Sequence, residues 1–162
     1  MKKAIATLAL IFAIQGVLAQ NIDDVFNRFK DKEGAEYVSI PPFLIKIGRL
    51  FMDKEDKSYR FIKGVNSVKT LDMEDCSSEI KKNFLKEANQ LNLNGYETLV
   101  QIKEKGESVK LIAKMDEEAI RELIIMIIGN GDCGLTLLEG KLKKEDINVI
   151  MTDDKIMIDG RE

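Results

Sequence analysis

Two segments of alternating residues, joined by a short polar turn, restrict the fold of this chain most strongly. Thr98, Val100 and Ile102 fall at every second position in the first segment. The second segment repeats the alternation with Val109, Leu111, Ala113 and Met115. A period of two is typical of a strand with one buried face, and the intervening Lys105-Gly106-Glu107 suits a hairpin loop. The pair therefore predicts an antiparallel sheet.

The segment from Ile120 to Ile128 fits two structures. Its apolar residues match a helical template of i, i+3, i+4, i+7 and i+8, which Asp116 could cap. However, five of its nine residues are isoleucine, a β-branched type that favours a strand buried on both faces. Asn130-Gly131, a strong hairpin signal, follows at once, and Leu135 to Leu138 can return as a second arm. We therefore favour strand, turn and strand over a helix.

Helices are expected before, between and after the strands. Asn21 is a plausible N-cap for a helix whose apolar face is Ile22, Val25, Phe26 and Phe29, ended by Gly34. A second helix is predicted over residues 43–52, and a third begins at Cys76-Ser77-Ser78, with serine as its N-cap. Residues 36–40 are expected to be a short extended piece, residues 65–73 a strand and residues 143–151 a closing helix. The fold class is therefore α+β, with a mainly antiparallel sheet of about five strands and helices packed on one face.

The N-terminus has the organisation of a secretory signal. Met1-Lys2-Lys3 precedes an apolar run from Ala4 to Ile14, and the segment closes with Val17-Leu18-Ala19. A spanning helix needs about 20 apolar residues, and Gln15 interrupts this one earlier. We expect cleavage after Ala19 and export to the periplasm or cell surface, without stable membrane insertion. The expected organisation is a signal peptide over residues 1–19, a single α+β domain over 20–152 and a tail over 153–162.

Composition excludes several classes of function. The chain has 25 basic and 28 acidic residues, and loss of Lys2 and Lys3 would bring its net charge from −3 to −5. An acidic chain without a basic stripe argues against nucleic acid as a partner. Histidine is absent, which removes the commonest general base and zinc ligand. We expect no cofactor and no metal.

Cys76 and Cys133 are the two cysteines of the chain. Export would place them in an oxidising compartment, where a disulfide can persist. Two unrelated thiols are the alternative, because cysteine is among the most buried residue types. We predict that Cys76 and Cys133 are bridged, although the spacing alone leaves both possibilities open.

No motif in the sequence indicates catalysis. The acidic clusters at 72–75, 116–118 and 153–154 lack the alternating spacing of a calcium loop and fit solvated faces or helix starts. Ser77 and Ser78 lack a Ser-x-x-Lys partner, and residues 129–132 lack the lysine of a phosphate loop. Two carboxylates from separate segments could still meet as an acid/base pair.

The predicted helix over residues 43–52 is the most unusual feature. Its apolar residues span a wider arc than one packed face requires, with Lys46 and Arg49 as its polar side chains. A helix wedged wholly inside the core is one interpretation, and a helix with a partner surface is the other. We expect Phe43 and Ile47 to be core, and Leu44 and Phe51 to be partly exposed as possible partner contacts.

Several stretches together are similar to those of a known family. These are Phe26-x-x-Phe29, the run from Gly34 to Pro41, Leu138-Glu139-Gly140 and Glu145-Asp146-Ile147. The chain resembles a domain-of-unknown-function family of small exported proteins from Bacteroides-type Gram-negative bacteria, over about residues 22–151. The resemblance implies envelope export and favours a strand for Ile120 to Ile128, but it supplies no reaction and no ligand. Family members often carry a lipoprotein cysteine after the signal, where this chain has Gln20.

The function is therefore unknown at the level of chemistry. Our leading hypothesis is an exported, non-enzymatic binding or interaction module of the cell envelope, with an envelope protein as its partner. The opposing hypotheses are a carboxylate-dependent hydrolase and a purely structural envelope protein. Two facing carboxylates in a deep cleft would favour the enzyme, and an exposed apolar surface would favour the binding module.

Overall fold

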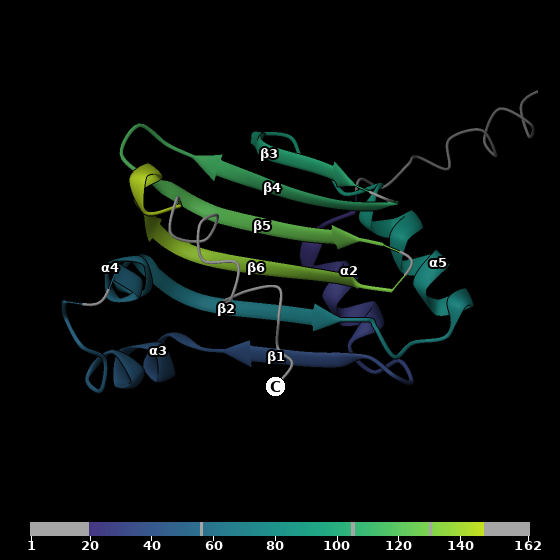
Figure 1. Cartoon of the computed structure of the whole chain (residues 1–162), viewed down its shortest axis with the longest axis horizontal. Coiled ribbons are helices and arrows are strands. Elements are labelled where there is room, and N and C mark those ends of the chain that lie inside the picture. Colours follow the sequence, from purple (N-terminus) through teal and green to yellow (C-terminus); the bar gives the residue numbers. More distant parts are fainter. Residues whose placement is uncertain (1–19, 56, 105, 130, 148–162) are drawn as a thin grey trace, which may run out of the picture.

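The chain is built around one antiparallel sheet of six strands, as a computed structural model shows (Figure 1). The structure describes residues 20–55, 57–104, 106–129 and 131–147. The strands lie in the order β1-β2-β6-β5-β4-β3, and every neighbouring pair is antiparallel. Their bounds are β1 Glu36–Ile40, β2 Val65–Asp72, β3 Tyr96–Glu104, β4 Glu107–Met115, β5 Ile120–Ile128 and β6 Cys133–Leu142. The predicted α+β class with an antiparallel sheet is confirmed.

Strand β5 settles the ambiguity at Ile120 to Ile128. It pairs with β4 on one side and with β6 on the other, so it lies inside the sheet rather than at an edge. Its successive residues belong to opposite faces, because Leu123 and Ile125 contribute to one apolar cluster while Ile124 and Met126 contribute to another. The isoleucine-rich segment is thus a strand buried on both faces, as predicted.

Helices α2 (Ile22–Phe29) and α5 (Ser78–Ala88) contribute to the apolar cluster on one face of the sheet. In Figure 1, α2 lies behind the sheet and α5 lies at its right-hand end. Helix α2 starts as predicted: the Asn21 side chain accepts a hydrogen bond from the Asp23 amide, and the Asn21 amide donates to Asp24. Ser77 caps α5 by accepting from the Ile80 amide at 3.4 Å. Phe29 and Phe84 meet edge to face between the two helices, with ring centroids 5.4 Å apart.

Helices α3 (Pro42–Arg49) and α4 (Lys57–Gly64) lie at the end of the sheet away from α5 (Figure 1). Their buried residues, Ile45 and Phe61, belong to the apolar cluster of the opposite sheet face. The expectation that helices pack on one face was therefore wrong. Both faces carry apolar residues because β4, β5 and β6 alternate between two clusters.

Other differences from the sequence prediction have local causes. The sheet has six strands rather than five because the short extended piece Glu36–Ile40 pairs with β2 as an edge strand. Helix α4 was not predicted, since Phe61 is its one deeply buried residue. Helix α3 ends at Arg49 rather than Met52. The predicted closing helix begins as a 3-10 turn over Lys144–Asp146, and residues 148–151 lie outside the described residues, as do the predicted signal segment 1–19 and the tail 153–162.

Helix α2 ends at Phe29 with Lys30 as its C-cap, so the prediction that Gly34 stops it was wrong. Gly34 lies in the loop that follows, and its conformation shows why glycine is needed there. Its φ is +82°, in the region that side chains disfavour. A Cβ atom at this position would lie 2.3 Å from the Asp75 carbonyl oxygen. Because Gly34 has no Cβ atom, the loop after α2 approaches the loop before α5 more closely than any other residue type at position 34 would allow.

Candidate functional site

Helix α3 packs against β2 and α4 through an unusual pair of side chains. Ile45 is 8% exposed and is the buried residue of the helix. One turn later, at i+4, Arg49 lies on the same side of the helix. Its guanidinium donates to the Ile62 carbonyl at 3.1 Å and to the Val65 carbonyl. An arginine thus helps attach α3 to the domain.

The other large apolar side chains of α3, and those of the two residues that follow it, are consequently exposed. Leu44 is 45% exposed and Phe51 is 85% exposed, in agreement with the exposure expected for both. Phe43 and Ile47, which were expected to be core, are 61% and 49% exposed, so that expectation was wrong. The physical reason is that Ile45 and Arg49 occupy the inward side of the helix.

Exposed apolar side chains are concentrated in this short part of the chain. The structure records eight large apolar side chains as exposed in the part of the chain it describes, and five of them lie between positions 43 and 51. We call this group the α3 surface: Phe43, Leu44, Ile47, Leu50 and Phe51. Exposed apolar groups that gather in one place mark interaction sites more often than scattered ones do.

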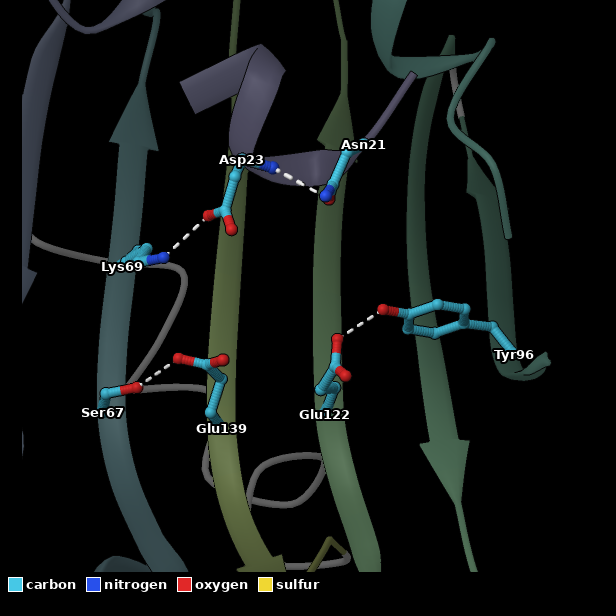
Figure 2. A network of polar contacts seen from close by, with 7 residues as sticks. All are labelled: Asn21, Asp23, Ser67, Lys69, Tyr96, Glu122 and Glu139. Atoms are coloured by element: carbon cyan, nitrogen blue, oxygen red, sulfur yellow. Dashed lines mark hydrogen bonds and ion pairs between the residues drawn. The ribbon is translucent and has the colours of Figure 1, made fainter. Parts of the chain in front are cut away.

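A second group of functional interest is polar and lies on the sheet (Figure 2). Glu122 on β5 and Glu139 on β6 are directly opposite each other in the strand register. Residues opposed in this way have Cβ atoms about 4.5–5.5 Å apart. The sequence left open that two carboxylates from separate segments could meet, and Glu122 and Glu139 are such a pair.

Each of these carboxylates accepts a hydrogen bond from another side chain of the protein. Ser67 donates its hydroxyl to Glu139 at 2.5 Å. Tyr96 on β3 reaches across β4 and donates its hydroxyl to Glu122, as Figure 2 shows. Burial, and then the hydrogen bond to Glu122, raise the pKa of the Tyr96 hydroxyl, so it stays protonated as a donor. Lys114 also lies 3.3 Å from Glu122.

The same polar group ties helix α2 to the sheet. Lys69 on β2 forms an ion pair with Asp23 in the first turn of α2, at 2.7 Å. The hydrogen bond to Asp23 raises the pKa of the Lys69 ammonium. These contacts attach the start of α2, which lies over β5 and β6 in Figure 2, to the neighbouring strand β2, which is a structural role.

One depression in the protein surface, with a volume of about 360 Å3, lies apart from this polar group. It is wide open and sits at the end of the β3–β4 hairpin, lined by Lys103, Glu104, Gly106, Glu107, Ser108 and Ile128. Neither Glu122 nor Glu139 lines it. The opposed carboxylates therefore do not share this depression.

Cys76 and Cys133 both carry free, buried thiols in the structure. They belong to the same apolar cluster, beneath α5. Burial raises the pKa of both thiols, that of Cys133 to about 11. Neither thiol therefore has the depressed pKa of a reactive nucleophile.

Within residues 20–147, less the gaps named above, no three or more His, Cys, Asp and Glu side chains gather in a way that could hold a metal ion. Over the same residues, no helix has both the length and the apolar character to cross a bilayer.

Comparison with known families gives one match, to a family described as a domain of unknown function (DUF4252), over residues 29–150. The chain belongs to this family. The match begins in the last turn of α2 and covers the whole of the six-stranded sheet, so the DUF4252 region includes both the α3 surface and the opposed carboxylates. Comparison with curated proteins and with solved structures gave no match.

Some features of the DUF4252 chain had no signal in the sequence. Nothing marks Arg49 as an inward-facing residue, because arginine at a helix end is usually solvated. Glu122 and Glu139 are 17 positions apart and meet through the β5–β6 register, which includes a bulge between Ile120 and Glu122. The wide apolar arc of residues 43–52 was the signal for the α3 surface, and it pointed to the correct helix.

Proposed function

We propose that this DUF4252 protein is an exported, non-enzymatic binding module of the cell envelope that holds a partner protein on its α3 surface. One observation carries the proposal: α3 turns Arg49 toward its own domain and Phe43, Leu44, Ile47, Leu50 and Phe51 away from it. An ordinary surface helix has the opposite arrangement.

The composition of the α3 surface suits protein recognition. Aromatic residues are enriched at protein interfaces, and large side chains near the centre of an interface carry most of the binding energy. Phe43 and Phe51 supply two such side chains, and both are more than half exposed. Fully burying a leucine or phenylalanine stabilises an association by about 1.5–3 kcal/mol, so a few of these contacts are sufficient for specific binding.

The chemistry of the partner follows from the residues around this surface. Lys46 is exposed on the same helix, although the chain as a whole is acidic, with a net charge of −3. We infer a partner segment that is mainly apolar and carries an acidic residue that can pair with Lys46. A protein segment of this kind fits better than an anionic lipid surface, which the acidic chain would repel.

Export rests on the sequence of the N-terminal segment. The basic start, the apolar run and Ala19 at the cleavage position support removal of residues 1–19. The DUF4252 match, from residue 29 to 150, lies wholly within the proposed mature chain. Intact mass of the protein from its native host tests this step: a mass that still includes residues 1–19, or a lipid adduct, would contradict it.

The hydrolase hypothesis is less well supported. Glu122 and Glu139 are opposed on the sheet, but Tyr96 and Ser67 already donate to them. A general acid and base need access to the substrate proton, and these carboxylates serve contacts within the domain. A purely structural envelope protein also explains the fold, but it gives no reason for an outward apolar helix.

The experiment compares two substitutions on the α3 surface with a matched control. Leu44→Ala and Phe51→Ala remove exposed apolar atoms from this surface, and Ile102→Ala removes them from β3, where Ile102 is also exposed. Each variant should unfold within about 0.5 kcal/mol of the wild type, as surface changes do. Crosslinking in the native envelope, followed by affinity purification, then identifies the proteins held by each variant.

The supporting result is specific to the surface. A partner should be captured by the wild type and by Ile102→Ala but not by Leu44→Ala or Phe51→Ala, and the purified partner should bind with the same order of affinities. Equal capture by all four proteins would place the contact elsewhere and contradict the proposal. A large loss of stability in the two α3 variants would show that these side chains are part of the core.

A further inference from the structure

The positions of Cys76 and Cys133 are fixed by the same backbone contacts. The Met73 amide, directly after β2, donates to the Cys133 carbonyl at 2.8 Å. The Cys76 amide then donates to the Met73 carbonyl at 3.1 Å, which closes a turn. Cys76 is therefore one turn away from the residue that pairs with Cys133.

Both side chains point to the same side of the sheet. Met73, Cys76 and Cys133 all belong to the apolar cluster covered by α2 and α5. The Cys76 side chain also raises the pKa of the Cys133 thiol, so the two groups lie within electrostatic range of each other. Segments that lie 57 positions apart in the sequence thus bring two thiols together at one end of the sheet.

We propose that Cys76 and Cys133 form an intramolecular disulfide that is made while the chain folds and is then sealed within the apolar cluster. The bond would join the loop before α5 to the start of β6. It rests on the export step of the proposed function, because an exported chain meets an oxidising compartment, but it is independent of the α3 surface, which lies at the other end of the sheet (Figure 1).

The chemistry is thiol–disulfide exchange with an oxidant that itself contains an exchangeable disulfide. One cysteine thiolate attacks that disulfide, forms a mixed disulfide and releases one thiolate of the oxidant. The second cysteine thiolate then attacks the mixed disulfide, closes the Cys76–Cys133 bond and releases the other thiolate. Two electrons pass from the protein to the oxidant, which leaves as two thiols carrying the two protons.

The timing follows from burial. Both side chains are buried once the fold is complete, so an oxidant reaches them only in an open chain. Burial raises the pKa of the Cys133 thiol from 9.0 to about 11, which makes its thiolate about 100-fold scarcer at a given pH. The higher nucleophilicity of such a thiolate restores only part of this loss, so attack by Cys133 is slower in the folded chain even before limited access is counted.

Lys81, Asp72 and Asp75 are the charged groups that act on these thiols. Lys81 on α5 lowers the pKa of both thiols, and Asp72 raises the pKa of both. Asp75 raises the pKa of the Cys76 thiol. Their effects are smaller than that of burial. The burial of the thiols, rather than one charged neighbour, therefore determines how slowly the folded protein is oxidised.

The experiment has two parts and uses the full chain. Protein from the native host is unfolded in the presence of an alkylating agent without reductant, and peptide mapping should find Cys76 joined to Cys133 with no alkylated cysteine. Reduced chain is then exposed to oxidised glutathione, once during refolding and once after refolding. The disulfide should form faster during refolding than after it, because both thiols are buried in the folded chain and burial limits both the access of the oxidant and the supply of thiolate.

Two alkylated cysteines per chain in the native protein would overturn the disulfide. Equal rates of oxidation during and after refolding would overturn its sealing in the core. The variants Cys76→Ala and Cys133→Ala provide the control for stability. Each alone should lower the urea midpoint of the oxidised protein, and the double variant should be little worse than the single ones, because either change removes the same bond. Additive losses would show that the two side chains act separately.

Discussion

Arg49 is predicted to hold α3 in its unusual orientation, and Arg49→Met tests this. Methionine retains an apolar stem of similar length but cannot donate to the carbonyls of Ile62 and Val65. A hydrogen bond from a charged group contributes about 1.5–3 kcal/mol when buried. Arg49 is only partly buried, so solvent weakens both bonds. We expect a loss of about 2 kcal/mol of unfolding free energy, less than the full sum.

Urea unfolding followed by far-ultraviolet circular dichroism measures this loss, since the chain has no tryptophan to report by fluorescence. Lys46→Met is the matched control. It removes a positive charge from the same helix, but Lys46 is exposed, and the change should stay within about 0.5 kcal/mol. Hydrogen exchange supplies a local measurement, because the amides of Leu44 and Ile45 donate to the Pro41 carbonyl at the start of α3.

Those two amides should exchange faster in Arg49→Met, while the amides of α2 should keep their protection. The same loss of stability in Arg49→Met and Lys46→Met would refute the reasoning. So would a destabilised Arg49→Met whose α3 amides exchange as in the wild type, because the stabilising contact would then not act through this helix.

Two further predictions follow from the backbone and from the thiols. Gly34→Ala should lower the free energy of unfolding by about 1–3 kcal/mol or more, because alanine is strained at φ +82° and its Cβ would meet the Asp75 carbonyl. Gly48→Ala is the control: the space around Gly48 is open, so the higher helix propensity of alanine should raise the free energy of unfolding by up to about 1 kcal/mol. Stability of the reduced protein should fall as pH rises from 9.0 toward 11, because burial raises the pKa of the Cys133 thiol to about 11 and the unfolded chain therefore loses that proton first. In Cys133→Ala this part of the pH dependence should be absent, and an unchanged alkaline profile would contradict the assignment.

The sequence predicted the elements whose signals are local. Isoleucine-rich β5 could be assigned because β-branched residues and a hairpin turn agreed, although the helical template also matched. Asn21 and Ser77 were recognisable caps because capping depends on residues two or three positions away. The antiparallel pairing of β3 with β4 and of β5 with β6 could be predicted from the short turns that join them. A short loop between two paired strands permits no other direction.

Features that depend on distant residues could not be predicted. β1 is a strand because it pairs with β2, which follows it at a distance in the sequence; Val38, for example, pairs with Thr70, 32 positions later. The opposed Glu122 and Glu139 depend on a register that a bulge shifts by one position. Such a shift exchanges the two faces of a strand, and an alternating pattern on one strand gives no information about its partner's register.

The error at Phe43 and Ile47 shows most clearly where periodicity stops being informative. The apolar positions of α3 extend almost all around the helix, so several rotations bury comparable apolar area. Turning the helix to bury Phe43 and Ile47 would remove Ile45 from its cluster and separate Arg49 from its two carbonyls. Burial of each apolar side chain is worth about 1.5–3 kcal/mol, and Ile45 together with the arginine bonds is worth about as much as the two side chains gained. A partner that covers the α3 surface avoids this exchange, because it buries Phe43 and Ile47 while Ile45 and Arg49 stay in place.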